Sequence, residues 1–432
     1  MKTKLILIFL FFCAGHFFAQ QTQVSIYQQR FDNYLNFKGA LSPFVKIDQS
    51  GVKIFKDALS KKNDSPELLI YWEETATFIN LVKTAGMDTL EAVMCRKGKN
   101  KWKEAELKRY GQNSKNIPSY TEQAPFTGKK IVIDPGHIAG NMDMARIEQK
   151  FLHFSKKNYP GLTADSIDIA EGILTYQTAS ILKKLLEEKG AEVFLSRGNN
   201  ESTFGMTYAD WLQKRKKIVL DSLKNTGDLN ATRYSSLMKD KDQQFFWDFF
   251  RDYELAQRVK KINSFQPDIT IIIHYNVDEK NTDWVKPSAA NYTMAFIGGG
   301  MTADVFKNLK GKINFLRLLL SEDLAGSEKL SALTVQQFNT SLHIPIAKQA
   351  DALYLKDNCL STASAGVFCR NLALCRGINS VLVYGECLFQ DNVNEYPVLS
   401  KQDKNYFGIQ TNERVYAVAQ AYYKALLNYF SK

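Results

Sequence analysis

The chain has few of the residues that mark several large functional classes. Its 432 residues include only five histidines and six cysteines, and no two cysteines form a C-x-x-C pair. The cysteines beyond the first twenty residues are Cys95, Cys359, Cys369, Cys375 and Cys387. An odd number with irregular spacing is a poor match to a disulfide framework or to a zinc finger. We therefore expect buried, mostly free thiols, with one bridge inside the 359–387 group as the alternative.

Long apolar runs are also missing after the N-terminus. Lys2 and Lys4 precede an uninterrupted apolar core from Leu5 to Phe12, and small residues follow as far as Ala19. This order is typical of a secretory signal peptide over residues 1–20, with a retained N-terminal anchor as the alternative. The apolar core is too short to cross a bilayer, and no later segment is long enough. The sequence predicts an exported protein, periplasmic or extracellular, with no transmembrane segment.

The charge balance is basic, with a formal net charge of +11. Such a balance suits an anionic partner, such as a cell-wall polymer, an anionic lipid or a nucleic acid. No basic cluster is interleaved with aromatic residues in the pattern of a nucleic-acid groove, and export argues against that partner. We therefore expect no nucleic-acid partner, but charge alone does not identify the ligand.

Residues 21–126 are predicted to form an N-terminal unit of their own. Strand-like pieces at 52–55 and 68–72 and a helix-like piece at 74–84 suggest a small mixed α/β unit. Pro118, Pro125 and Gly128 then mark a linker. The chain has no internal repeat and no low-complexity tract, and no pattern in this unit indicates what it does.

From residue 127 to the C-terminus the pattern alternates between strands and helices. We expect the following strands: 130–134, 192–196, 269–274, 291–297, 366–372 and 379–385. We expect helices at 168–189, 302–321 and 411–430, and an irregular loop between residue 134 and residue 165. This alternation predicts an α/β domain with a largely parallel sheet and helices on both faces. The stretch 205–264 is longer than one crossover requires and is expected to form several helices as an insert.

Two histidines close apolar strands. His137 ends Lys-Ile-Val-Ile-Asp-Pro-Gly-His at 130–137, and His274 ends Asp-Ile-Thr-Ile-Ile-Ile-His at 268–274. Ligands collect at the carboxyl edge of a parallel sheet. Two neutral imidazoles at that edge are most simply interpreted as half of a zinc site.

Two carboxylates are candidates for the same edge. Glu171 falls in the first turn of the helix that follows the first strand, and this turn lies at that edge in a right-handed β-α-β unit. The alternative is that Glu171 only complements the helix dipole. Glu386 ends the apolar strand that begins at Ser380. A carboxylate there is costly unless it is paired, solvated or functional.

Together these segments resemble the zinc-dependent N-acetylmuramoyl-L-alanine amidases, which cut the peptide stem from the glycan strands of bacterial cell wall. The matching residues are Asp134-Pro135-Gly136-His137, Glu171 with Ala179, Arg197 after the second strand, Asp268 with His274 and Asn276, and Glu386 with Phe389 and Asn392. Each motif alone is weak, but their order and spacing are compatible over residues 126–430.

The resemblance implies a function and a set of roles. His137, Glu171 and His274 would hold Zn²⁺, and Glu386 would be the catalytic carboxylate acting on peptidoglycan. Two imidazoles and one carboxylate leave zinc an open position for water, whose pKa can fall from about 15.7 to about 7. Asp134 and Asn276 would orient ligands or substrate, with a role as turn-forming polar residues as the alternative.

The sequence also departs from the family pattern. Ile138-Ala139-Gly140 follows His137 where many members have two glycines, and Cys387-Leu388 follows Glu386 where a glycine is common. Some members carry helical inserts that occlude the zinc until a partner moves them. The insert at 205–264 is therefore expected to respond to a regulatory protein, or else to add packing surface against the N-terminal unit.

Two other functions stay open on the sequence. The same ligands would serve an exported zinc peptidase or deacetylase that acts on another amide, and product mass would distinguish it. A non-catalytic cell-wall-binding protein with a degenerate site would bind zinc tightly without turnover.

Overall fold

The structure, a computed structural model, describes residues 23–111 and 124–431. The expected signal peptide at 1–20 and the linker residue Pro118 lie outside the described residues. Within these ranges no helix is both long enough and apolar enough to cross a membrane.

The centre of the molecule is a seven-stranded sheet in the order β10-β11-β9-β12-β8-β4-β7. Its strands are β4 (Lys130–Pro135), β7 (Glu192–Leu195), β8 (Ile269–Asn276), β9 (Met294–Gly298), β10 (Cys359–Ser361), β11 (Val367–Arg370) and β12 (Val381–Phe389). Strands β7, β4, β8 and β12 are parallel, and β9 pairs antiparallel with β12 and parallel with β11. The prediction of a largely parallel sheet is confirmed.

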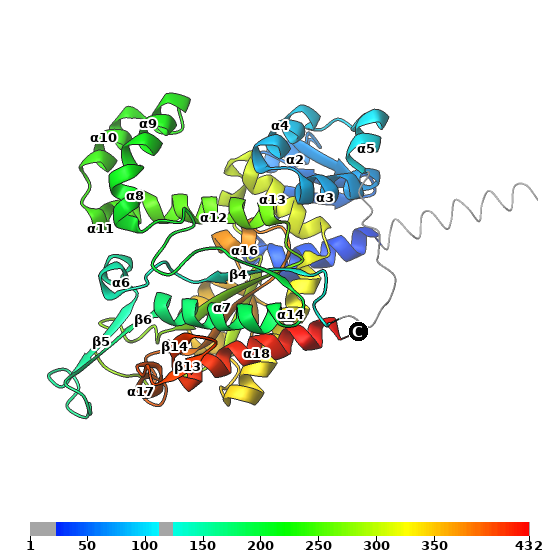
Figure 1. Ribbon diagram of the computed structural model, residues 1–432. Coiled ribbons are helices and arrows are strands. Elements are labelled where there is room, and N and C mark those ends of the chain that lie inside the picture. Colours follow the sequence, from blue (N-terminus) through cyan, green and yellow to red (C-terminus); the bar gives the residue numbers. More distant parts are fainter. Residues whose placement is uncertain (1–22, 112–123, 432) are drawn as a thin grey trace, which may run out of the picture.

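Helices cover both faces of this sheet, as predicted (Figure 1). On one face lie α7 (Glu171–Glu187), α14 (Asp323–Leu342) and α18 (Glu413–Phe430); on the other lie α12 (Arg251–Phe265), α15 (Leu353–Asn358) and α16 (Ala373–Gly377). Successive residues of a strand point to opposite faces, so Ile131 and Ile133 pack on the α7 side whereas Val132 packs on the α12 side. The α14 helix was not anticipated.

The N-terminal unit has its own sheet but not its own core. Its elements are β1 (Val45–Asp48), β2 (Gly51–Ile54), β3 (Leu68–Tyr71), α2 (Ala58–Lys62), α3 (Thr75–Thr84), α4 (Met87–Lys97) and α5 (Glu104–Gly111). Phe31 packs edge-on against Phe315 of α13 (Leu309–Leu320), with ring centroids 6.1 Å apart. The backbone N–H of Gly300 also donates to the carbonyl of Tyr34 over 2.8 Å. One hydrophobic cluster therefore runs through both parts.

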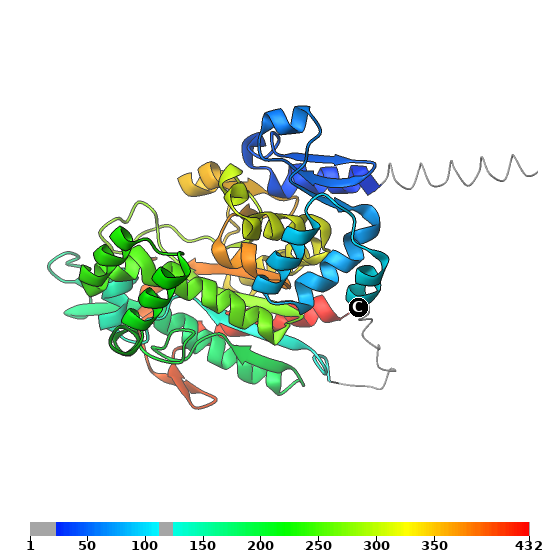
Figure 2. The same cartoon turned by 90° about the horizontal axis from the view of Figure 1, so that it is seen from above.

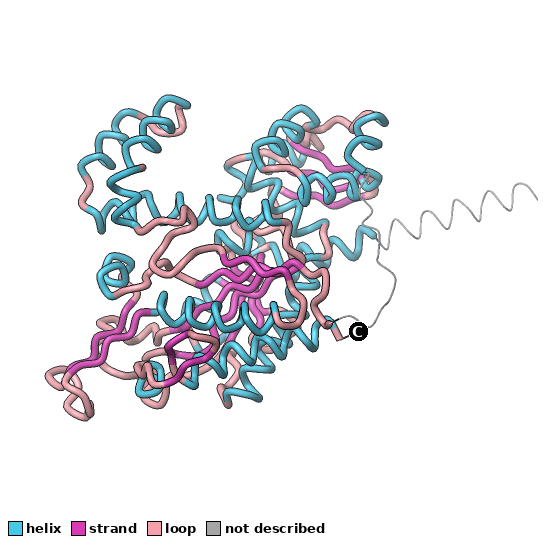
Figure 3. Tube along the Cα trace, viewed as in Figure 1, coloured by secondary structure: helices cyan, strands magenta, loops and turns pink. Residues whose placement is uncertain are grey.

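The expected irregular loop between β4 and α7 is wrong, because the segment is folded. It contains α6 (Met142–Glu148) and a hairpin of β5 (Phe151–Ser155) and β6 (Ser166–Ala170), which projects from the body (Figure 3). Asn141 caps α6 by accepting from the N–H of Met144 over 3.0 Å. Asp168 pairs with His153 in the hairpin, so the next helix begins at Glu171 and not at Asp168.

The predicted insert is helical. It comprises α8 (Tyr208–Lys214), α9 (Lys216–Thr226), α10 (Ala231–Lys239), α11 (Asp242–Phe245), the π-helical turn η4 (Phe246–Phe250) and then α12. Figures 1 and 2 both place α8 to α10 well away from the N-terminal unit, so the alternative of packing against that unit does not hold for these helices. Their aromatic core, with the fully buried Trp211 and Phe250, packs instead against Ile138 and Met144. The end of the insert does contact the unit, since Lys260 Nζ of α12 lies 3.7 Å from Asp88 of α4.

Smaller elements complete the chain. They are η1 (Phe31–Leu35), η2 (Phe37–Gly39), η3 (Trp72–Glu74), η5 (Ala303–Lys307), η6 (Gln349–Asp351), α17 (Tyr396–Leu399), β13 (Lys404–Tyr406) and β14 (Ile409–Thr411). All five described cysteines are free; Cys359, Cys369, Cys375 and Cys387 are buried, and Cys95 is exposed. The expectation of free thiols is confirmed, and four of them are buried.

Candidate functional site

Three side chains from different elements meet at the carboxyl edge of the sheet. His137 follows β4, Glu171 begins α7 and His274 lies near the end of β8. One potential ligand atom from each residue lies within 4.8 Å of those of the other two. Glu171 Oε2 is 3.0 Å from His137 Nε2, and Glu171 Oε1 is 2.8 Å from His274 Nδ1. The structure therefore brings together the three residues that the sequence selected as metal ligands.

The Glu171 carboxylate lies between the two imidazoles. It is 3% exposed, and its Oε1 also accepts from the backbone N–H of Tyr275 over 3.2 Å. Burial alone would raise the pKa of Glu171, but His137 and His274 hold it well below its usual value. The carboxylate is therefore anionic, and its environment suits a cationic partner.

His137 is held in an uncommon backbone conformation. Its φ is 58°, in the left-handed region that non-glycine residues rarely adopt. The preceding Gly136 is required by space, because a Cβ there would lie 2.3 Å from the His274 ring. The Pro-Gly-His turn thus lets two imidazoles approach, with ring centroids 5.0 Å apart. Backbone outliers of this kind concentrate at functional sites.

A buried guanidinium fixes the backbone around these residues. Arg197, just after β7, donates through Nε to the carbonyl of Pro135 over 3.0 Å. Its Nη2 donates to the carbonyls of Gly136 and Gly172, each over 2.9 Å. Arg197 therefore ties the turn that carries His137 to the first turn of α7, which carries Glu171. The sequence marked this Arg by its position after the second strand but not by this role.

Asp134 lies beneath the cluster and has no exposed surface. Its Oδ1 accepts from the hydroxyl of Ser196, and from Arg258 Nη1 of α12 over 3.3 Å. Arg258 also pairs with Glu254 over 2.8 Å. A fully buried side chain does not reach substrate in this conformation. Of the roles expected for Asp134, this placement is compatible with orienting a ligand, His137, through the end of β4, and with a structural role near the turn.

Asn276 lines the cleft beside the cluster. Its Oδ1 accepts from the N–H of Val277 over 2.8 Å, and its Nδ2 donates to the hydroxyl of Tyr354 over 3.1 Å. The amide therefore orders the end of β8 and one wall of the cleft. Both expected roles, turn formation and substrate positioning, are compatible with this placement.

Glu386 lies directly beside His274, since the two residues are partners in the parallel pairing of β12 and β8. Burial, and after it the negative charge of Glu171, raises the pKa of Glu386 to about 8. A carboxyl group with a pKa near neutrality is suited to take up and release a proton. The neighbouring Tyr384 stacks on His274, with centroids 4.5 Å apart and planes 4° apart, and so fixes that imidazole.

Glu148 is a site residue that the sequence did not reveal. It ends α6, is 4% exposed, and accepts from the N–H groups of Ile138 and Ala139. Its Oε1 lies 3.8 Å from His137 Nδ1, on the opposite side of the ring from Glu171. Burial opposes protonation of His137, but Glu171 and Glu148 together raise its pKa to about 9. The only signal for Glu148 in the sequence was an acid within the segment interpreted as a loop.

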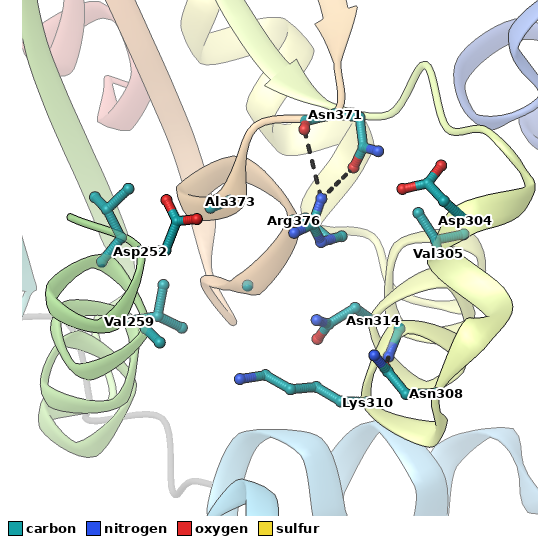
Figure 4. Close-up of a pocket in the computed structure, with 14 residues that line it drawn as sticks. Asp252, Val259, Asp304, Val305, Asn308, Lys310, Asn314, Asn371, Ala373 and Arg376 are labelled. Carbon is teal, nitrogen blue, oxygen red and sulfur yellow. Dashed lines mark hydrogen bonds between the residues drawn. The ribbon is translucent and has the colours of Figure 1, made fainter. Parts of the chain in front are cut away.

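The cluster opens into a cavity of about 760 Å³. All three cluster residues line it, together with Glu148, Asn276, Tyr384 and Glu386. A separate cavity of about 520 Å³ lies between α12, α13 and α16, where Arg376 bonds to Asn371 (Figure 4). That cavity is lined by no histidine and by no member of the cluster. We therefore place the candidate catalytic site in the cavity of about 760 Å³.

The donor set decides which chemistry is available. Two imidazoles and one carboxylate are ligands that zinc takes in hydrolytic sites, where a fourth position stays open for water or substrate. A further carboxylate, the half-buried Glu386, lies beside them. A largely parallel α/β sheet with this arrangement at its carboxyl edge defines a candidate metal-dependent hydrolase.

Comparison with known families names the class. Residues 131–425, more than half of the chain, match the family described as N-acetylmuramoyl-L-alanine amidase. The chain therefore belongs to that family, and it is an enzyme that hydrolyses an amide bond of peptidoglycan.

Solved structures of the same class are similar at low identity. The CwlD amidase from Clostridioides difficile, solved with the GerS lipoprotein, is 17% identical, with 70% of this chain and 99% of that chain covered and a TM-score of 0.37. Ami1 from Mycobacterium smegmatis is 13% identical, with coverage of 71% and 98% and a TM-score of 0.38. No curated protein matches the chain.

The Glu148 contact leads to the first prediction. Glu148→Gln places an amide N–H₂ where the carboxylate accepts from two backbone N–H groups, and it removes the negative charge beside His137. Partners that orient a ligating histidine typically contribute 10–100-fold to metal affinity. We therefore expect zinc affinity to fall by about 10–100-fold, measured by competition with a chromogenic chelator. Glu192→Gln, at an exposed carboxylate, is the control; equal affinities in the two variants would contradict the role given to Glu148.

Proposed function

We propose that the chain is an exported zinc-dependent N-acetylmuramoyl-L-alanine amidase that holds zinc through His137, Glu171 and His274. The observation that carries the proposal is the convergence of these three side chains at one sheet edge, inside the region matched by the family. The residues 1–20 that resemble a secretory leader, and a basic chain acting on an anionic wall polymer, support the exported location.

Each residue near the cluster has a defined task in this proposal. When bound, zinc supplies a Lewis acid and lowers the pKa of water. Tyr384 and Glu148 hold the two imidazoles in orientation through the stacking and the ionic contact described above. Glu386 takes a proton from the attacking water and returns it to the amine that leaves with L-alanine.

Product analysis tests the activity and its metal together. Purified peptidoglycan is digested by the mature protein, with and without a chelator, and the products are identified by mass spectrometry. We expect intact stem peptides with a free L-alanine amine, loss of activity with chelator, and recovery on addition of zinc. His274→Ala should lose both zinc and activity, since it removes one of three ligands.

Two outcomes of that experiment would overturn the proposal. Full activity in protein with no measurable zinc would show that the reaction does not require the metal. Cleavage within the peptide, or removal of acetyl groups, would instead assign the site to a peptidase or a deacetylase.

Glu386 is proposed to be a catalytic group and not a fourth ligand. A fourth protein ligand would close the position that hydrolysis requires. Glu386→Gln keeps the shape of the side chain but cannot accept the proton. We expect it to retain stoichiometric zinc while turnover falls by about two to four orders of magnitude.

The matched control is Glu279→Gln, a carboxylate that lines the same cleft and accepts from the N–H of Leu353. Zinc content by atomic absorption and turnover are measured for both variants. Loss of zinc in Glu386→Gln would show that Glu386 is a ligand. Near-normal turnover would show that it has no catalytic role.

The helical insert is proposed to be where a regulatory protein acts. Phe246, Trp247 and Arg251, at its end, line the cleft, so a movement of the insert would change access to the cluster. Ile218 of α9 and Met238 of α10 are large apolar residues with 60% and 37% of their surface exposed.

The insert must be trimmed with care to test this idea. Deletion of all of 205–264 would remove Arg258, which pairs with the buried Asp134. Residues 217–239 are a better target, because Lys216 Nζ lies 3.4 Å from the carbonyl of Asp240 and a short Gly-Ser linker can join these ends. We expect this variant to bind zinc fully and to keep or gain activity on peptidoglycan. If no variant trimmed in this way folds, the insert is structural and the gating role is wrong.

A further inference from the structure

The catalytic cleft continues beyond the zinc ligands. An outer cavity of about 680 Å³ adjoins the cavity of the cluster. Both are lined by Lys150, Trp247, Thr282 and Trp284. The outer cavity extends to Phe151 and His153 of the hairpin. The two cavities together form a groove that leads away from the cluster, between the hairpin on one side and residues 282–285 on the other.

Two tryptophans lie at the junction of these cavities, and each is hydrogen-bonded to the segment 147–153. Trp247 Nε1 donates to the carbonyl of Ile147 over 3.2 Å. Trp284 has a φ of 52°, again in the left-handed region, and its carbonyl accepts from the N–H of His153 over 3.2 Å. Both rings are only partly buried. A tryptophan kept in a strained backbone conformation at the rim of a cleft indicates a ligand-binding role.

The cations that line the 680 Å³ cavity, Arg146, Lys150 and His153, each have a partner. Arg146 pairs with Asp143 over 3.2 Å, and His153 Nδ1 lies 2.7 Å from Asp168. Lys150 Nζ lies over the Trp284 ring, 5.4 Å from its centroid. In that cavity a substrate arm with several carboxylates would have to compete with these partners for the cations. An uncharged arm with alternating apolar and hydroxylated faces fits better.

We propose that this groove binds the glycan strand of the substrate, and that Trp247 and Trp284 provide stacking faces for its sugar rings. The inference rests on the proposed function. The bond that an amidase cuts lies at the branch between the glycan and the stem peptide, so the cleft must receive two chemically different arms. Indole rings offer flat apolar faces to the C–H faces of pyranose rings, and their N–H groups bond elsewhere.

Binding of peptide-free glycan tests the proposal without any catalytic step. The probe is an uncharged tetrasaccharide of N-acetylglucosamine, titrated into the zinc-loaded protein while tryptophan fluorescence is followed. We expect saturable binding by the wild type that is weakened at least tenfold in Trp284→Ala, with most of the affinity kept in Trp284→Phe. Calorimetry repeats the titration independently of fluorescence, because the variants remove a fluorophore.

Phe407→Ala is the matched control. Phe407 is also an exposed aromatic residue with a positive φ, 57°, but it lies on the turn between β13 and β14 and lines neither cavity of the groove. This variant should bind the tetrasaccharide like the wild type. Circular dichroism melting establishes that each variant is folded, and Trp284→Phe keeps the test decisive if Trp284→Ala is not.

The outcomes separate this inference from the proposed function. No binding of the peptide-free tetrasaccharide, or equal binding by the wild type and both Trp284 variants, would overturn the groove assignment while amidase activity stands. Weaker binding of a free stem peptide by Trp284→Ala, with tetrasaccharide binding intact, would show that the groove holds the peptide arm and would also overturn it. A protein without amidase activity that still binds the tetrasaccharide through Trp284 would overturn the proposed function alone.

Discussion

The guanidinium of Arg197 lies where three segments distant in sequence meet, and the geometry of the cluster depends on it. It satisfies carbonyls at the end of β4, in the Pro-Gly-His turn and in the first turn of α7. A buried carbonyl left without a donor costs about 1–3 kcal/mol. The hydroxyl of Thr175 shares this task, donating to the carbonyls of Gly136 and Gly172 over 2.7 and 3.2 Å, while Arg197 joins both to Pro135 and fixes the separation between His137 and Glu171. A lysine would reach only part of this set, since its single ammonium lacks the planar fork.

Buried charges also connect the site to the insert. Asp134, Arg258 and Glu254 form a buried ionic network that joins β4 to α12. When one member of a buried pair is removed, the other is left uncompensated, at a cost of about 3–5 kcal/mol. The last helix of the insert, α12, therefore stabilises the site, whereas α9 and α10 project away from it (Figure 1). The insert is continuous in sequence but divided in its physical role.

The sequence alone predicted the elements and site residues that have a strong local pattern. Strands such as 130–134 and 269–274 are short β-branched runs that end on a histidine, and parallel pairing brings such ends to one edge. The sequence did not predict the features that depend on contacts between separate segments. Strand β5 pairs only with β6, and α6 is two turns long, so neither carries enough periodicity to stand out. Arg258 and Trp284 acquire their roles through partners 124 and 131 residues away, and Glu148 through the fold of a short segment that shows no clear pattern.

The shared core of the two parts bears on how the protein could be processed. Phe31 lies against Phe315, and Arg30 donates to the carbonyls of Leu319 and Ser321 over 2.8 Å each. A backbone cut between Gly111 and Phe126 would break the chain but not these contacts. The two fragments would remain a non-covalent complex, because separation would expose apolar surface on both. Proteolytic maturation at this junction would therefore change the covalent connectivity of the enzyme without releasing a free catalytic domain.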